Sequence, residues 1–356
     1  MFLTMPQLFD LMVESGASDV HITVGRPPVL RVHGRLKNVR HPPLTSADTM
    51  TLVESISPER MLTEFRETGS ADFGFAHGDR ARFRVAIFRQ RGQASMVARL
   101  IPSRLLSFDE IGLPQSVRDL CARPRGLILV TGPTGSGKTT TLATMIDAVN
   151  TNLDCHIITI EDPIEYYHEH KKSIVNQREV GVDVTSFAEG LRRGLRQDPD
   201  VILLGEMRDK ETISTAITAA ETGHLVFGTL HTTGSARTMD RIIDQFPHDQ
   251  QEQVRVQLSV SILAVVSQVL MPRADKPGVI AGFEVMIVTP AIENHIRKAE
   301  TFKIPSTIQT SKGLGMHLLD DHLLELIKAG KITKETAMEW AQQPRTLLDK
   351  LAEGTA

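Results

Sequence analysis

A glycine-rich segment between an apolar run and a helical stretch constrains this chain more than any other feature. Residues 132–139 read Gly-Pro-Thr-Gly-Ser-Gly-Lys-Thr, which fits the phosphate-binding pattern G-x-x-x-x-G-K-[ST]. The segment follows an expected strand at 127–131, apolar over 127–130, and a helix is expected to begin near Lys138. Strand, loop and helix therefore occur in the order that a phosphate-binding loop of an α/β fold requires.

Each part of this loop has a chemical task. The glycines let backbone N–H groups surround phosphate oxygens, and the start of the helix adds a favourable dipole. Lys138 is expected to reach the β- and γ-phosphates, and the Thr139 hydroxyl to hold Mg²⁺. The predicted cofactors are thus ATP and Mg²⁺. The predicted nucleotide-binding residues are Gly132, Pro133, Thr134, Gly135, Ser136, Gly137, Lys138, Thr139 and Thr140.

Carboxylates follow two further apolar runs, where a metal ion and an attacking water would need partners. The run at 201–204 leads through a glycine into Glu206, the candidate for orienting the magnesium shell. The run at 157–160 leads into an acidic segment, 161–165, whose proline disfavours both helix and sheet. One carboxylate of this segment should activate water, although Glu161 alone fits a solvated loop equally well.

Histidines flank a fourth apolar run, at 226–230. His224 precedes it and His231 follows it. A neutral histidine could donate a hydrogen bond to a γ-phosphate oxygen. A histidine at a strand end is also often only a satisfied polar group, and the periodicity does not decide between these interpretations.

The first hundred residues have a different texture and predict an α+β domain of mostly antiparallel sheet. Thr4 as N-cap, Gln7 three residues later and Gly16 as the stop indicate a helix. A hairpin is expected next, with its turn at 25–28. Further strands are expected at 72–76, 82–88 and 95–101, and a helical piece at 45–67.

Four segments are predicted along the chain. They are an N-terminal domain (1–101), a linker with Pro102, Gly112 and Pro114 (102–115), an α/β core with a parallel sheet (116–290) and a helical C-terminal subdomain (291–356). The uncharged run 257–271 is predicted to be a buried helix too short for a membrane span. Thr333 is predicted to cap a final helix near Trp340.

Composition excludes several classes of protein. The 356 residues carry a net charge of −3, which rules out a global polycation that covers nucleic acid. The 2 cysteines cannot build a disulfide-rich scaffold or a four-thiolate zinc module. Aromatic residues make up only 4%, too few for a platform that stacks single-stranded bases. No signal peptide is visible, so a cytoplasmic location is expected.

At this point the motifs resemble those of a known family. Residues 196–209 are similar to the signature of the secretion ATPase superfamily that powers type II secretion and type IV pili. Residues 160–165 resemble its acidic box and 223–232 its histidine box. Within the superfamily the likeness is greatest to the pilus retraction, or twitching-motility, group, which residues 17–21 and 313–316 also resemble. The resemblance covers nearly the whole chain.

The resemblance implies a homohexameric ring in which a PAS-like N-terminal domain packs on a RecA-like ATPase core. It implies that Glu165 is the catalytic glutamate, that Glu206 is the Walker B carboxylate sharing magnesium with Thr139, and that His224 and His231 belong to the histidine box. The implied function is an ATP-driven motor for pilus retraction. It would be cytoplasmic and peripheral at the inner membrane, with the pilus platform protein as partner and no nucleic acid.

A stretch of the N-terminal domain, residues 80–104, contains seven arginines and no acid. It is compatible with a solvated basic face. The alternative is that some of its arginines reach the nucleotide as arginine fingers, within one subunit or across a subunit boundary, because charge developing on the transferred phosphoryl group favours fixed cations. The candidates are Arg82 and Arg84 on one strand face, Arg91 on another, and Arg99.

Two departures from the group leave the output partner open. Residues 291–296 read Ala-Ile-Glu-Asn-His-Ile where the group has Ala-Ile-Arg-Asn-Leu-Ile, so Glu293 and His295 differ, and the histidine box continues with unusual residues at 233–235. An accessory relative of the retraction motor is one alternative. An assembly or secretion ATPase is another, but it normally carries a four-cysteine insertion. A RecA-like nucleic-acid motor and a nucleotide-gated scaffold are disfavoured.

Overall fold

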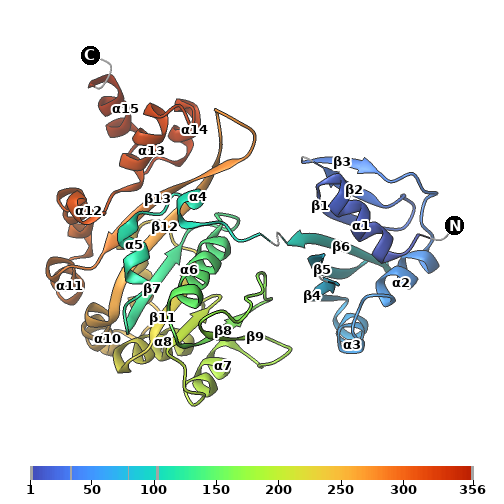
Figure 1. Cartoon of the computed structure of the whole chain (residues 1–356), viewed down its shortest axis with the longest axis horizontal. Coiled ribbons are helices and arrows are strands. Elements are labelled where there is room, and N and C mark those ends of the chain that lie inside the picture. Colours follow the sequence, from blue (N-terminus) through green and yellow to red (C-terminus); the bar gives the residue numbers. More distant parts are fainter. Residues whose placement is uncertain (1–2, 33, 79, 102–103, 354–356) are drawn as a thin grey trace. The chain divides into compact units, whose positions relative to one another are not determined.

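The computed structural model describes residues 3–32, 34–78, 80–101 and 104–353. Its internal contacts divide the chain into two compact units (Figure 1). The first is Met1–Arg104 together with Pro163–Tyr167, and the second is Leu105–Asp162 with His168–Ala356. Pro102 of the expected linker lies outside the described residues.

The first unit is a six-stranded antiparallel sheet with the order β3-β2-β1-β6-β5-β4. Its first helix begins after Thr4, and the predicted capping box with Gln7 is present. Apolar side chains of the helices and of the strands form one buried cluster. The elements are α1 (Met5–Ser15), β1 (Ala17–Ile22), β2 (Val29–Val32), β3 (Arg35–Asn38), α2 (Ser46–Glu54), α3 (Glu59–Thr68), β4 (Ser70–His77), β5 (Ala81–Gln90) and β6 (Gln93–Ile101).

Three details of this unit differ from the sequence predictions. The helical piece at 45–67 is two helices, because Pro58 cannot continue a helix and instead precedes the first turn of α3. The edge strand β3 was not expected, since all of its residues are exposed and it shows no apolar alternation. Arg91 is not in a strand but in the Arg91-Gly92 turn between β5 and β6, where both residues have positive φ, of 52° and 77°.

The second unit contains a seven-stranded sheet with the order β13-β12-β7-β11-β10-β8-β9. All four predicted buried strands are present and parallel, and only β13 runs antiparallel to its neighbour. The strands are β7 (Gly126–Thr131), β8 (His156–Glu161), β9 (Ile174–Glu179), β10 (Val201–Leu204), β11 (Leu225–Leu230), β12 (Ile262–Pro272) and β13 (Val279–Ile287).

Helices cover both faces of this sheet, as a parallel sheet requires. One buried cluster joins α6 to one face, and another joins α7, α8, α9 and α10 to the other. The helices are α4 (Phe108–Ile111), α5 (Gln115–Leu120), α6 (Lys138–Asn152), α7 (Phe187–Gly194), α8 (Lys210–Thr222), α9 (Ser235–Ile243), α10 (His248–Ser261), α11 (Pro290–Arg297), α12 (Ile304–Thr310), α13 (Leu319–Lys328), α14 (Lys334–Trp340) and α15 (Pro344–Glu353).

The prediction of a single buried helix at 257–271 was wrong. Helix α10 ends at Ser261 and the chain continues directly as strand β12, which pairs with β7. An uncharged run cannot by itself distinguish a buried helix from a buried strand, and β-branched residues such as Val265 and Val266 favour the strand. The helix capped by Thr333 exists, but α15 follows it.

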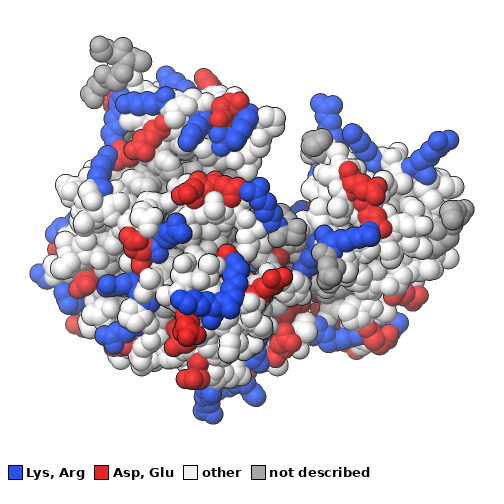
Figure 2. All heavy atoms as spheres, viewed as in Figure 1, with Lys and Arg blue, Asp and Glu red and all other residues white. Residues whose placement is uncertain are grey.

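Charge is mixed on the surface of the second unit. On the face shown in Figure 2, basic and acidic side chains are interspersed over this unit. Within residues 3–32, 34–78, 80–101 and 104–353, no helix has the combination of length and apolar character that crossing a lipid bilayer requires.

Candidate functional site

The phosphate-binding loop joins β7 to α6, as predicted. Lys138 opens α6 and its Nζ donates to the carbonyl oxygens of Gly132 and Pro133, at 2.9 and 3.0 Å. The ammonium group therefore lies over the loop itself, where a phosphate would contact it. Thr139 and Thr140 occupy the first turn of α6 and are partly exposed.

Gly132 is required by the space around the loop as well as by its backbone. Its φ is +143°, and a Cβ at this position would lie only 2.2 Å from the backbone carbonyl oxygen of Gln268. No side chain can be accommodated against a backbone atom at that distance. The loop therefore lies tightly against strand β12.

Gln268 of β12 holds the loop from beneath. Its side chain is 1% exposed, and its amide nitrogen donates to the carbonyl oxygen of Ser136. Its amide oxygen accepts from Thr141 Oγ1 at 2.8 Å. One buried amide thus bonds both the loop and the first turns of α6, so the loop conformation depends on a strand far away in the sequence.

Glu206 follows β10, and its carboxylate contacts the side chains of Arg208 and His231. Arg208 Nε bonds its Oε1, and His231 Nε2 lies 3.1 Å from the same oxygen. Burial raises the pKa of Glu206, but the hydrogen bond and the charge from Arg208 lower that pKa by more. Glu206 is therefore ionised at neutral pH, and His231, which follows β11, is held beside it.

Glu161 ends β8 as a buried side chain rather than a solvated one. It is 6% exposed, and its Oε1 accepts from Thr159 Oγ1 at 2.6 Å and from Gln177 Nε2 at 3.2 Å. The interpretation of Glu161 as a solvated loop carboxylate was therefore wrong. Parallel strands leave a polar residue at a strand end partly covered by the neighbouring strand, here β9.

Glu165 and the four candidate arginines all belong to the first unit. Arg82 stacks on the ring of Tyr167, and Arg99 donates to Asp19 at 2.8 Å. Arg84 is exposed on the same strand as Arg82, and Arg91 is exposed in the turn between β5 and β6. The structure thus distinguishes four arginines that the sequence treats alike.

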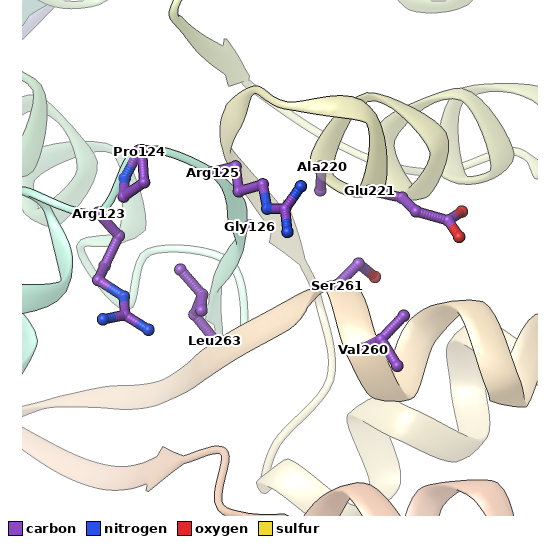
Figure 3. Close-up of a pocket in the computed structure, with 9 residues that line it drawn as sticks. All are labelled: Arg123, Pro124, Arg125, Gly126, Ala220, Glu221, Val260, Ser261 and Leu263. Carbon is purple, nitrogen blue, oxygen red and sulfur yellow. The ribbon is translucent and has the colours of Figure 1, made fainter.

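The structure does not bring His224 together with His231. His224 precedes β11 and its Nδ1 lies 2.9 Å from the carbonyl oxygen of Ala219, near the end of α8, whereas His231 follows the same strand. Near this amino end of the sheet is a pocket of about 460 Å³ (Figure 3). It is lined by Arg123, Arg125 and Gly126 among others, and Arg125 extends toward the end of α8.

The two unusual residues of the C-terminal region both lie on α11, where they are partly exposed. His295 Nε2 lies 3.2 Å from Thr307 Oγ1 of α12, and its Nδ1 is 3.7 Å from Glu300. His295 therefore makes local polar contacts that a leucine could not make.

Sequence reasoning missed two residues of the site. Arg208 had a visible signal, since it follows Glu206 by two positions and a loop at a strand end brings such residues together. Gln268 had none, because an amide within an apolar run gives no indication of which strand lies beside the loop.

The ligand preferences of Mg²⁺ can be compared with the donor groups of this chain. Mg²⁺ prefers oxygen ligands and usually takes only one or two from the protein, with phosphates and waters supplying the rest. The Thr139 hydroxyl and the ionised Glu206 are of that kind. The described residues contain no cluster of three or more His, Cys, Asp or Glu side chains that would hold a metal without nucleotide. The residues fit a nucleotide-bound magnesium ion.

Comparison with known proteins gives consistent matches. The family model described as "Type II/IV secretion system protein" matches residues 3–336. The chain is 47% identical over 342 residues to the type IV pilus retraction ATPase PilT of Pseudomonas aeruginosa, covering 96% of this chain and 99% of that protein. It is 45% identical over 320 residues to a twitching motility protein of Neisseria gonorrhoeae, covering 90% and 86%.

A solved structure agrees with these matches. The crystal structure of the pilus retraction motor PilT with bound ADP superposes with a TM-score of 0.91 at 47% identity, covering 97% of this chain and 98% of that one. The likeness thus includes the mixed α/β fold and extends over both units. The chain belongs to the type II/IV secretion system protein family, among its PilT-type pilus retraction ATPases.

Proposed function

We propose that this protein is an ATP-hydrolysing motor that powers retraction of a type IV pilus and twitching motility. One observation supports the ATPase part above all. The phosphate-binding loop, His231 and Glu206 follow β7, β11 and β10, which are neighbours in the sheet. The carboxyl ends of parallel strands are where α/β folds bind their ligands.

In this proposal the loop binds the phosphates of ATP through its backbone N–H groups and through Lys138, which turns from the loop carbonyls to the phosphates. Thr139 and Glu206 would hold Mg²⁺, directly or through water, and the ion would neutralise charge on the β- and γ-phosphates when bound. His231 beside Glu206 is positioned to detect whether a γ-phosphate is present. For His224 we propose a role only in the local structure after α8.

Glu165 is proposed as the general base that takes a proton from the attacking water. Arg82, Arg84, Arg91 and Arg99 are proposed as candidates for the cation that stabilises charge on the transferred phosphoryl group. The bond of Arg99 to the buried carboxylate of Asp19 favours a structural role for that arginine, so we rank Arg82 first.

The wider assembly is also part of the proposal. We propose a homohexamer with a PAS-like N-terminal domain (1–101), a linker (102–115), a RecA-like core (116–290) and a helical C-terminal subdomain (291–356). It would work in the cytoplasm at the inner membrane, with the platform protein of the pilus as partner. The interspersed surface charge of the second unit is a reason not to propose nucleic acid as a ligand (Figure 2).

The enzymatic part is tested by comparing two variants of the purified protein. Glu165→Gln should bind nucleotide like the wild type while its turnover falls by orders of magnitude, because water loses its base. Lys138→Ala should instead weaken nucleotide binding, because a charge-assisted contact is lost. Wild-type turnover in Glu165→Gln would remove that residue from the mechanism.

The cellular part is tested with a deletion strain scored for surface pili and for twitching. Excess pili without movement is the outcome expected of a retraction motor. Loss of pili would instead indicate an assembly ATPase. Because Glu293 and His295 change the surface of α11, an accessory motor is the second candidate, and it predicts normal pili with reduced retraction force.

A further inference from the structure

The segment that carries Glu165 makes its contacts in a different unit from the residues that flank it in the sequence. Residues Pro163–Tyr167 belong to the first unit, whereas the residues before and after them belong to the second. The phosphate-binding loop, Glu206 and His231 all lie in the second unit. By its contacts, Glu165 therefore belongs to a different unit from the residues proposed to bind phosphate.

A stacking contact joins this segment to the sheet of the first unit. The guanidinium carbon of Arg82, on β5, lies 3.8 Å from the centroid of the Tyr167 ring. Tyr167 is 60% exposed, so burial contributes little to fixing its ring. A cation–π contact of this geometry orients both partners, because the cation is attracted to the face of the ring.

The neighbouring strand leaves room for Arg82 to adopt this position. A Cβ at Gly74, on β4, would lie 2.7 Å from Arg82 Nη2. Gly74 does not have a positive φ, so its backbone conformation is open to other residues. The glycine is therefore explained by space for the guanidinium group and not by a turn.

We propose that Tyr167 and Gly74 are positioning residues for ATP hydrolysis. They act through Arg82, whose stack on Tyr167 fixes the segment that carries Glu165 to the first unit. This inference rests on the proposed function, because it assumes that Glu165 is the general base. It differs from an arginine-finger role, since the stack orders the acidic segment whether or not Arg82 contacts nucleotide.

The kinetic test compares Tyr167→Ala with Tyr167→Phe in the full-length purified protein. A cation–π contact at an exposed site corresponds to a factor of about two to five, so Tyr167→Ala should lower kcat by about that factor with KM unchanged. Tyr167→Phe keeps an aromatic face and should retain wild-type kcat. Gly74→Ala should lower kcat like Tyr167→Ala. If the Phe and Ala variants have the same kcat, the stacking argument is wrong.

A second measurement separates this inference from the role of Glu165. Hydrogen–deuterium exchange of the amides of residues 164–167, measured without nucleotide, should be faster in Tyr167→Ala and in Arg82→Ala than in the wild type. In the double variant it should be no faster than in either single variant. Additive effects would show that the two side chains act independently and would overturn the proposal. If Glu165→Gln keeps full turnover, the general-base assignment fails, while the exchange result still tests the stack.

Discussion

Replacing Gln268 by methionine tests whether strand β12 holds the phosphate-binding loop. Methionine has nearly the same length and volume, so the change removes hydrogen bonds without opening a large cavity. Two bonds are lost, the one donated to Ser136 and the one accepted from Thr141. Each contributes about 1 kcal/mol net, and leaving a buried carbonyl unsatisfied costs roughly 1–3 kcal/mol more.

The Thr141 hydroxyl can turn to a carbonyl of its own helix, so only the Ser136 carbonyl is stranded. The expected loss in the free energy of unfolding is then about 3 kcal/mol, or a Tm lower by roughly 6–12 °C for a unit of this size. Because the same bond orders the loop, the Kd for ADP should rise by about tenfold or more. Each tenfold rise in Kd corresponds to about 1.4 kcal/mol of binding free energy that is now spent on ordering the loop.

Thermal unfolding and titration with a fluorescent ADP analogue measure the two effects on the same protein. Gln253→Met is a matched control, because Gln253 is exposed on α10 and should change neither value. Wild-type Tm and Kd in Gln268→Met would refute the reasoning. A lower Tm with an unchanged Kd would show that Gln268 stabilises the sheet but does not order the loop.

Three further predictions follow from single contacts. In Gly132→Ala the loop must move by at least about 0.8 Å to bring the new Cβ from 2.2 Å to about 3.0 Å from the Gln268 carbonyl oxygen, so turnover should fall about 100-fold. Gly313→Ala is the control, because the space around Gly313 is open and turnover should not change. Glu206→Gln removes the carboxylate that His231 contacts at 3.1 Å, and magnesium titrations of ATP turnover should show a weaker apparent affinity for the ion; an unchanged titration would exclude Glu206 from metal binding. Burial lowers the pKa of His322 to about 4, so its neutral form is favoured in the fold, and stability is lost as the pH falls from about 6.5 toward about 4, by up to about 3 kcal/mol. Thermal unfolding measured across this pH range should show a weaker dependence of Tm on pH for His322→Gln than for the wild type. The same dependence in both proteins would contradict the assignment.

The local part of the site could be predicted from the sequence because its signals are short-range. The order of strand, glycine loop, Lys138 and helix identifies a phosphate site, since each residue acts within a few positions of the next. The same holds for helix α1, whose capping box needs only Thr4 and Gln7. Buried parallel strands can be recognised in the sequence as apolar runs bounded by polar residues.

The sequence could not predict contacts between strands that are distant along the chain. The run at 257–271 divides into the end of α10 and strand β12 because β7 offers an unpaired edge, and only that pairing places Gln268 beneath the loop. Similarly, His224 and His231 both look like site residues by their position in a motif, but a six-residue strand separates them, and each belongs to a different end of the sheet.

What the sequence alone determined is therefore the chemistry available: a phosphate loop, acidic strand ends and a set of arginines in the first hundred residues. What the tertiary structure decided is which of these groups act together. It pairs Glu206 with Arg208 and His231, stacks Arg82 on Tyr167 and assigns Glu165 to the first unit. The physical reason is that loop chemistry depends on neighbours in the chain, whereas ion pairs and stacks depend on which strands lie side by side.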